Sequence, residues 1–361
     1  MSAEAALRVA IAGCHRMVTR TPGSHNWAAG FAAAPETQVV AVFDHGAETR
    51  AGFKECWGDQ WPGVELFDDY NRMLAVTRPD VVCVATRQTM HAEQIVAAVT
   101  SGVRGVLCDK PLATSLEEMD RIVAACRSAR VPFAFGLDRR WSARYRAARQ
   151  TVESGAIGRV TGVLAYGVPN LINHGCHWYD TALSLAGDAE IAWVSGLVDD
   201  VSSEPEGSSR RRDPAGRAQI GLASGVTAYV TPDGGPGLAF EVLGDKGRLL
   251  LMNDGRDAQL WSAAPAAASG DPAPRGSQGL RLQPLEWPEP ETGWPAGPAA
   301  VRDLACAIRE GRSTVCDVDE ARRATEVGFA IHTSSAAGGA RVALADVDRT
   351  LRIESLPWGN E

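Results

Sequence analysis

Lysine is scarce in this sequence, and Lys110 stands where a lysine side chain could do chemistry. Of the 36 Lys and Arg residues only three are lysines, the other two being Lys54 and Lys246. Arginine keeps its proton throughout the working pH range, whereas a buried lysine can release it. Lys110 follows the apolar run 105–109 and precedes Pro111, which restricts the backbone just after it. An ammonium group here could hydrogen-bond to an oxygen atom that gains or loses a proton.

His177 is the second candidate for proton transfer, because an imidazole titrates in the useful range. Asn173 stands four residues before it, and an amide can orient a hydroxyl group but cannot take its proton. His174, next to Asn173, supplies a second imidazole.

The first part of the chain alternates short apolar runs with segments of helix length. The pattern predicts buried strands at 7–13, 38–44, 81–86 and 105–109, and helices at 25–35, 91–102 and 115–129. The last helix is expected to begin at Ser115, because acidic residues follow in its first turn. Strands separated by helices imply a parallel, doubly wound sheet with right-handed crossovers.

The pattern changes after about residue 158. Longer strands joined by Gly-, Asp- and Pro-containing turns are expected at 158–168, 191–200, 217–233, 238–252 and 257–263. They favour a large, open, mainly antiparallel sheet in an α+β domain, which can leave one face for a ligand or a partner chain. Segments 203–217 and 264–297 are expected to be surface loops, and 301–312 and 319–339 to be helices.

The turn after the first strand is a weak dinucleotide signal. A dinucleotide fold favours G-x-G-x-x-G here, and only Gly13 is present, with His15 and Val18 at the other two places. We expect cofactor contacts from Gly13, His15, Arg16 and Met17. Any strand-to-loop turn would explain this segment equally well.

Asp44 ends the second strand, where a carboxylate accepts hydrogen bonds from an adenosine ribose. An acid there repels a 2′-phosphate, so NAD is favoured over NADP. His45 and Arg50 keep NADP possible. The alternative interpretation is that Asp44 only forms the turn before Gly46.

Composition excludes several classes of protein. The formal net charge of −8 argues against general binding to nucleic acid or to an anionic membrane. No apolar run is long enough for a membrane span, and the start lacks the pattern of a signal peptide, so a cytoplasmic protein is expected. The scattered histidines and cysteines show no ligand spacing, and we expect no metal site.

Several motifs, in this order along the chain, resemble the Gfo/Idh/MocA oxidoreductases, the group of glucose–fructose oxidoreductase and inositol dehydrogenase. That family shows A-T-P-N-x-x-H-x-E, E-K-P, N-R-R-F, S-G-x-I-G and D-x-G-x-H-x-x-D. The matching segments here are 85–93, 109–111, 138–141, 154–158 and 173–180, followed by 241–247 in the C-terminal sheet. The departures are Arg87 for proline, Gln88 for asparagine, Asp109 for glutamate and Asn173 for aspartate.

The resemblance implies site residues and an activity. It implies cofactor contacts from Thr86, Arg87, His91, Asp109, Lys110 and Arg139, and substrate contacts from Lys110, Arg140, Trp141, Asn173, His174 and His177. It marks Lys110, His177 and Asn173 as the candidate catalytic residues. Lys110 would bond to the oxygen that changes its protonation as hydride moves to or from the nicotinamide. The implied enzyme is an NAD(P)-dependent dehydrogenase or reductase acting on a secondary alcohol or ketone of a sugar, cyclitol or related metabolite.

The implied organisation is a Rossmann domain over 1–138 and a substrate-binding and oligomerisation domain over 139–361, whose C-terminal helices can pack back on the first. A homodimer or homotetramer through the C-terminal sheet is expected from the family. Two alternatives stay open. One is a redox-neutral enzyme with tightly held NAD, which oxidises a sugar transiently for cleavage or epimerisation. The other is a non-catalytic relative that binds NAD or a metabolite.

Overall fold

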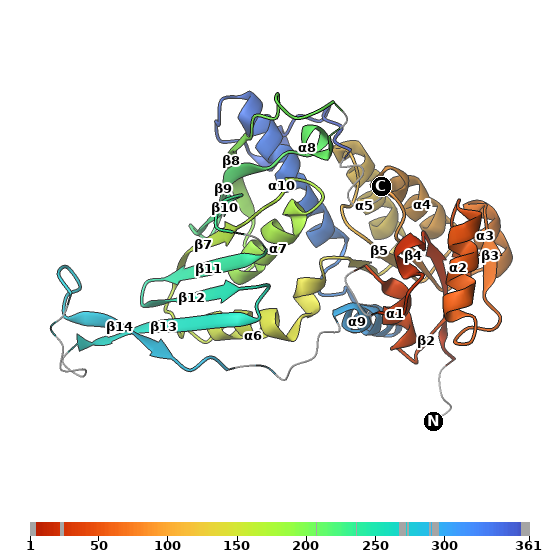
Figure 1. The fold of residues 1–361 in the computed structure, drawn as a ribbon, viewed down its shortest axis with the longest axis horizontal. Helices are drawn as coiled ribbons and strands as arrows, with labels where there is room; N and C mark the ends of the chain where they lie inside the picture. The colour runs from red at the N-terminus through yellow and green to blue at the C-terminus, as the bar shows by residue number, and fades with distance from the viewer. Residues whose placement is uncertain are drawn as a thin grey trace. The chain divides into compact units, whose positions relative to one another are not determined.

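The computed structural model describes residues 5–21, 25–206, 208–235, 237–266, 272, 274–288, 290 and 296–354. The chain divides into two compact units (Figure 1). Unit 1 holds the described residues within 1–142, 294–325 and 349–354, and unit 2 those within 143–293 and 326–348.

Unit 1 is built on a six-stranded sheet with the strand order β3-β2-β1-β4-β5-β6. All its neighbouring strands are parallel. Its strands are β1 (Leu7–Ala12), β2 (Thr37–Phe43), β3 (Glu65–Phe67), β4 (Val81–Val84), β5 (Gly105–Cys108) and β6 (Phe133–Phe135). Every residue of β4 and β5 is buried, which agrees with their continuously apolar sequences. The expected parallel, doubly wound sheet is confirmed.

Helices connect these strands. They are α1 (Trp27–Ala32), α2 (Ala47–Trp57), α3 (Tyr70–Thr77), α4 (Gln88–Thr100) and α5 (Leu116–Ala129), with the 3₁₀ turns η1 (His15–Met17) and η2 (Asp138–Trp141). Ser115 caps α5 as expected, since its hydroxyl accepts a hydrogen bond from the Glu118 N–H. The glutamates in the first turn of α5 favour the same helix start.

A late part of the chain completes unit 1. Helix α9 (Ala296–Glu310) packs against α1, β5 and β6. Glycines allow this close approach: a Cβ on Gly30 would lie 3.3 Å from the carbonyl carbon of Gly297, and one on Gly105 would lie 2.6 Å from Cδ1 of Ile308. Unit 1 also receives the segment 349–354, in which Arg352 pairs with Glu118 of α5.

Unit 2 is built on an eight-stranded sheet with the order β14-β13-β12-β11-β7-β10-β9-β8. Among the described strands of this eight-stranded sheet, β7 and β10 form the one parallel pair, and the other neighbours are antiparallel. Its strands are β7 (Val160–Tyr166), β8 (Ile191–Val198), β9 (Gly216–Leu222), β10 (Thr227–Thr231), β11 (Ala239–Gly244), β12 (Gly247–Met252), β13 (Asp257–Pro265) and β14 (Leu280–Leu285). The expected mainly antiparallel sheet is confirmed.

The remaining elements of unit 2 are α6 (Ala143–Glu153), α7 (Gly175–Leu185), the short α8 (Ser209–Arg212), η4 (Leu344–Asp346) and the second part of α10 (Val318–Ala336), whose first part belongs to unit 1. Helix α7 packs on β7 and β10.

The expectation of an unbroken loop over 264–297 is wrong, because β14 pairs with β13 from Leu280 to Leu285 and α9 begins at Ala296. The expected loop over 203–217 contains α8 and the start of β9. Residues 207, 267–271, 273, 289 and 291–295 of these two segments lie outside the described residues.

Candidate functional site

The candidate residues of unit 1 follow the carboxyl ends of four neighbouring parallel strands. Gly13 follows β1, Asp44 follows β2, Ala85 and Thr86 follow β4, and Asp109 follows β5. These strands are adjacent in the order β2-β1-β4-β5, so the residues meet at one edge of the sheet. Ligands of such sheets bind at this edge.

Gly13 is required where it stands. Its φ of +84° lies in the left-handed region, and a Cβ would meet the carbonyl oxygen of Ala85 at 2.6 Å. The chain then enters η1, where His15 and Arg16 are exposed and Met17 is buried. His15 and Arg16 are therefore accessible to a ligand, whereas Met17 packs inside and its carbonyl accepts a hydrogen bond from the indole of Trp57 at 2.6 Å.

Asp44 closes the turn after β1 and the turn after β2. One carboxylate oxygen accepts the Cys14 N–H at 3.0 Å, and the other accepts the Gly46 N–H at 2.9 Å. The bond to the Gly46 N–H is the one expected if Asp44 forms the turn before Gly46. The Arg50 guanidinium donates to the Asp44 carbonyl at 2.5 Å. Each carboxylate oxygen can accept a second bond, so Asp44 can still receive a ribose hydroxyl.

His91, on the first turn of α4, braces two loops from the inside. Its Nδ1 lies 2.9 Å from the carbonyl oxygen of Pro111, and its Nε2 lies 3.2 Å from that of Thr86. The side chain is fully buried, and this burial lowers the pKa of His91. The ring has no exposed surface for a cofactor, so we revise its expected direct contact to a positioning role.

Thr86 donates its hydroxyl proton to Oε1 of Gln94 at 2.5 Å. The amide nitrogen of Gln94 is buried and has no hydrogen-bond partner among the described residues, and the same holds for the indole nitrogen of Trp27. Arg87 is exposed, as a side chain available to an anionic group would be.

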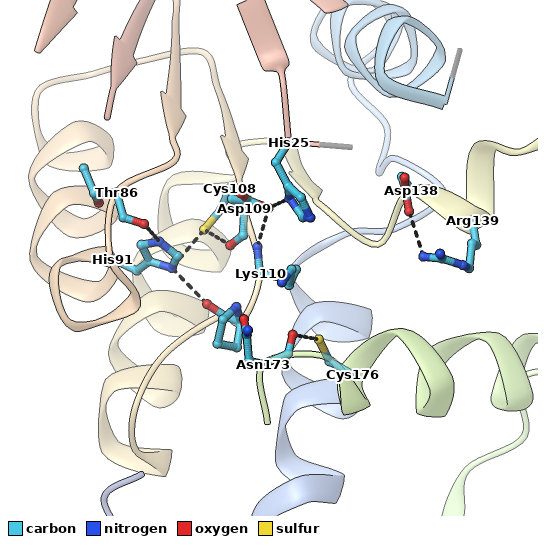
Figure 2. Close-up of polar contacts among 11 residues, drawn as sticks. His25, Thr86, His91, Cys108, Asp109, Lys110, Asp138, Arg139, Asn173 and Cys176 are labelled. Atoms are coloured by element: carbon cyan, nitrogen blue, oxygen red, sulfur yellow. Dashed lines mark hydrogen bonds and ion pairs between the residues drawn. The ribbon is translucent and has the colours of Figure 1, made fainter. Parts of the chain in front are cut away.

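Asp109 pairs with a residue that the sequence did not suggest. His25 Nδ1 lies 2.6 Å from Asp109 Oδ1, which also accepts the backbone N–H of Lys110 at 2.9 Å (Figure 2). Burial alone would raise the pKa of Asp109, but the charge and hydrogen bond of His25, together with the charge of Lys110, hold it far below its usual range. Lys110 is partly buried, and its peptide bond to Pro111 is cis.

The segment after β6 supplies two arginines and a tryptophan. Arg139 pairs with Asp138 at 3.2 Å, both side chains being mostly buried (Figure 2). Arg140 is partly buried, and its charge acts on Glu320. Trp141 is only 4% exposed, and its indole N–H donates to Asp303 of α9 at 3.0 Å. This environment gives Trp141 a packing role and does not support its expected place in a substrate pocket.

In unit 2, a buried carboxylate holds the segment with the candidate substrate residues. Asp213 is fully buried and accepts the N–H groups of Ile172 and Asn173, each at 2.8 Å. Asn173 and His177 are 8% and 6% exposed. The His177 N–H donates to the His174 carbonyl at 2.9 Å as α7 begins.

His174 is fixed by Asn170, whose side-chain oxygen accepts the His174 N–H at 2.7 Å and whose amide nitrogen lies 3.0 Å from His174 Nδ1. An amide N–H facing Nδ1 assigns the remaining ring proton of a neutral His174 to Nε2. Asp180 is 1% exposed within α7, in line with a supporting rather than a reacting position.

Sequence reasoning missed His25 and Asp213. Each is remote in sequence from its partner, His25 by 84 residues from Asp109 and Asp213 by 40 from Asn173. Neither lies in a motif. His25 is a polar residue beside the apolar run 27–34, whereas Asp213 stands in an Arg-, Pro- and Gly-containing segment that carried no signal.

Two further findings concern the described part of the chain. No group of three or more His, Cys, Asp and Glu side chains there is arranged to hold a metal ion. None of the helices described is long and apolar enough to cross a membrane.

The first part of the chain matches the model of a known protein family. Residues 7–137 match the family model of Gfo/Idh/MocA proteins, described as an oxidoreductase family with an NAD-binding Rossmann fold. Residues 7–137 are a Gfo/Idh/MocA domain. The family resemblance inferred from the motifs is thereby confirmed for this part of the chain, together with its class of cofactor.

Curated relatives of the Gfo/Idh/MocA domain carry dehydrogenase and reductase names. Inositol 2-dehydrogenase 3 of Saccharopolyspora erythraea is 32% identical over 49% of this chain and 56% of its own. The 1,5-anhydro-D-fructose reductase of Ensifer adhaerens is 32% identical over 38% of this chain and 39% of its own. D-glucoside 3-dehydrogenase of Escherichia coli is 24% identical over 50% and 54%. The chain thus spans about half the length of the curated relatives it matches.

Solved structures extend the likeness of fold beyond the Gfo/Idh/MocA domain. Levoglucosan dehydrogenase in complex with NADH and L-sorbose has a TM-score of 0.73 at 19% identity, covering 94% of this chain and 99% of that one. The aldose–aldose oxidoreductase of Caulobacter crescentus has a TM-score of 0.74 at 20% identity over 94% and 99%. At such identities the comparison shows a shared fold.

The described residues fit a dinucleotide at the edge of the Gfo/Idh/MocA domain. Gly13 leaves no room for a Cβ beside Ala85, as a close backbone turn requires. Gln94 and Trp27 offer buried donors that no described residue satisfies, and Asp44 keeps acceptor capacity. Gly13, His15, Arg16, Asp44 and Thr86 are the residues that would hold the cofactor.

Proposed function

We propose that this protein is an NAD(P)-dependent oxidoreductase, with NAD preferred, that acts on a secondary alcohol or ketone of a sugar, cyclitol or related small metabolite. The position of Lys110 carries the proposal: it is a partly buried lysine two residues after the end of β5, at the ligand-binding edge of an NAD-binding domain. The names of the curated relatives support the class of substrate.

In the proposed reaction the alcohol loses a hydride to the cofactor and a proton to the protein. Bound NAD would accept the hydride, with both electrons of the C–H bond, from the alcohol carbon. The hydroxyl proton passes to a side chain of the protein, and the C–O bond becomes a carbonyl. Lys110 is the proposed proton acceptor. In the reverse direction it returns the proton.

A cofactor titration is the first test of this function. NAD and NADP are titrated onto the purified protein with detection by calorimetry. We expect tighter binding of NAD, and a loss of about tenfold or more for Asp44→Ala, which removes a charged hydrogen-bond acceptor. Asp44→Asn keeps one acceptor oxygen without the charge, and is expected to narrow the preference for NAD over NADP. Binding of neither cofactor would refute the proposal.

A substrate screen is the second test. Sugars, cyclitols and their keto forms are screened for NADH formation or consumption, with Lys110→Met as the matched variant because it keeps the length of the side chain without the amine. We expect Lys110→Met to lower kcat about 100-fold or more, as loss of an acid–base group does. Full turnover by Lys110→Met would refute the mechanism. Product without net NADH would favour the redox-neutral alternative, and NAD binding without any turnover the non-catalytic one.

We also propose that the protein forms a homodimer or homotetramer through the eight-stranded sheet. Tyr229 of β10 lies opposite Gln219 of β9, which lies opposite Ser195 of β8, so the three share one face of the sheet. Leu197 is two residues beyond Ser195 on that face. Leu197 and Tyr229 are 47% and 43% exposed, which supports an apolar contact surface.

A further inference from the structure

Gln94 joins helix α4 to the loop that follows β4. Its Oε1 atom accepts the hydroxyl proton of Thr86 at 2.5 Å, and its main-chain carbonyl accepts the Tyr70 hydroxyl at 2.7 Å. Gln94 is 3% exposed, whereas Thr86 is partly exposed. A buried amide therefore holds, from the inside, a hydroxyl group that stands at the ligand-binding edge of unit 1.

The amide nitrogen of Gln94 makes this residue a costly choice for packing. The nitrogen is buried, and no described residue accepts its hydrogen atoms. A buried N–H group without a partner costs free energy that an apolar side chain of similar shape does not. Packing alone therefore does not explain a glutamine at this position. What the glutamine adds is the oxygen atom that faces Thr86.

The backbone of Thr86 is fixed independently of Gln94. Its carbonyl oxygen lies 3.2 Å from Nε2 of His91 (Figure 2), and its nitrogen would lie 2.8 Å from a Cβ on Gly13. With the backbone held in this way, the contact with Gln94 sets the direction of the hydroxyl proton. A hydroxyl group that donates its proton within the protein meets a ligand through its oxygen, as a hydrogen-bond acceptor.

Thr86 lies on the nicotinamide side of the proposed cofactor site. Thr86 and Asp44 follow strands on opposite sides of β1, whose end at Gly13 lies between them. With the adenosine ribose at Asp44, a dinucleotide that crosses Gly13 brings its nicotinamide half to Thr86. That half carries O–H donors on its ribose and N–H donors on its carboxamide, and both kinds of donor suit an acceptor oxygen.

We propose that Gln94 is a positioning residue for the nicotinamide half of the cofactor: by taking the hydroxyl proton of Thr86, it presents the Thr86 oxygen as an acceptor to an O–H or N–H donor of that half. This inference rests on the proposed cofactor site at the edge of unit 1. Gln94 acts there through Thr86.

Binding of NAD, ADP-ribose and ADP tests the inference without turnover. Calorimetric titrations measure the Kd of each compound on the native protein and on Gln94→Met, which keeps the length of the side chain without its oxygen and nitrogen. ADP lacks the nicotinamide half. We expect Gln94→Met to raise the Kd of NAD about threefold or more and to leave the Kd of ADP unchanged. ADP-ribose keeps the second ribose without the ring, so an equal rise in its Kd assigns the donor to the ribose and an unchanged Kd assigns it to the carboxamide.

Thr86→Val separates positioning from a general structural role. It removes the hydroxyl group and should raise the Kd of NAD by itself. In the Thr86→Val background, Gln94→Met should cause no further loss, because Gln94 acts through that hydroxyl group. The Tm of Gln94→Met, measured before nucleotide is added, should equal or exceed the native Tm, since a buried amide without a partner is removed. Gln94→Glu keeps an oxygen for Thr86 and should retain most of the NAD affinity. The matched control is Glu93→Met, an exposed change at the neighbouring position of α4, which should alter neither Kd.

An unchanged Kd of NAD in Gln94→Met would overturn the inference. So would an equal rise in the Kd of ADP, or losses of NAD affinity that add up in the double variant. Should Gln94→Met fail to fold, Gln94→Asn withdraws the amide from Thr86 by one methylene group, and the same results decide. A native protein that binds neither NAD nor NADP refutes the proposed function and this inference with it, whereas NAD binding that does not depend on Gln94 refutes this inference alone.

Discussion

The Nδ1 atom of His91 lies 2.9 Å from the carbonyl oxygen of Pro111, so a helix residue holds the loop that carries Lys110. Through its other nitrogen, 3.2 Å from the Thr86 carbonyl, the same ring holds the loop after β4. Two strand ends that must stay at a fixed separation around a ligand are thus joined by one buried side chain.

Replacement of His91 by alanine should loosen both loops. We expect a loss of about 1–3 kcal/mol in the free energy of unfolding, because a carbonyl loses the one N–H that the neutral ring donates and a cavity forms. NAD affinity should fall as well. Urea unfolding and the NAD titration measure the two effects, with Glu93→Ala, an exposed substitution on the same helix, as the control. Unchanged stability would contradict the bracing role.

Asp213 offers a test of the segment that bears Asn173 and His177. Asp213→Asn keeps the shape but turns one acceptor into a donor that faces a backbone N–H. We expect a loss of about 1–3 kcal/mol in the free energy of unfolding and a lower kcat. Denaturant titration and steady-state kinetics measure these. Wild-type kinetics at unchanged stability would show that the carboxylate is dispensable there.

The raised pKa of Glu320 predicts that the free energy of unfolding decreases as pH rises. Burial, followed by its contact with Asp317, raises the pKa of Glu320 from 4.5 to about 7, against the opposing charge of Arg140. Between these two values the unfolded chain has released a proton that the folded protein keeps, so the free energy of unfolding decreases as pH increases. Glu320→Gln should remove roughly 1–3 kcal/mol of this decline. Urea unfolding at pH 5, 6, 7 and 8 tests it, and an equally steep decline in the variant would contradict the assignment.

The lowered pKa of His332 predicts the opposite pH dependence of the free energy of unfolding. Burial lowers the pKa of His332 from 6.5 to about 4, and its Nε2 has no hydrogen-bond partner among the described residues. Between those pH values the unfolded chain binds a proton at His332 that the folded protein does not bind. The free energy of unfolding therefore decreases as pH falls from 6.5 towards 4. His332→Phe should flatten this limb by roughly 1–3 kcal/mol. Thermal unfolding at several acidic pH values measures it, and an unaltered acid limb would count against a buried neutral imidazole.

The exposed face of β8 and β10 predicts the behaviour of charged variants. Leu197→Asp and Tyr229→Asp should each lower the molar mass found by light scattering to that of the monomer, because an apolar contact would then bury an unpaired charge. Gln150→Asp, at an exposed position of α6, is the control and should leave the mass unchanged. A protein that is monomeric before any substitution refutes the proposed oligomer.

The elements that sequence patterns predicted well are those with a local physical cause. Continuous apolar runs marked β4 and β5, which are buried throughout, and Ser115 with its following acids marked the start of α5. The position of Lys110 at a strand end followed from the same periodicity. Strand β14 was missed because it is an exposed edge strand that contains Pro284 and stands within a segment rich in Pro, Gly, Ala and Ser, a composition typical of loops.

The contacts that sequence patterns could not predict join distant parts of the chain. The approach of His25 to Asp109 depends on the path of a whole loop, and the hydrogen bond between Trp141 and Asp303 depends on the placement of α9. A tryptophan beside two arginines is equally compatible with a ligand pocket and with a helix interface. Only the tertiary structure distinguishes these cases.

Unit 1 is built from segments that lie far apart in the sequence, and this affects its folding during synthesis. Helix α9 covers β5 and β6, and Ile308 fills the space beside Gly105, yet these residues are translated long after the sheet they cover. A nascent chain that has just left the ribosome with the sheet complete therefore exposes an apolar face until all of unit 2's strands have followed. During that interval the polypeptide is a natural client for a chaperone, and a gene truncated after the sheet would encode an aggregation-prone product.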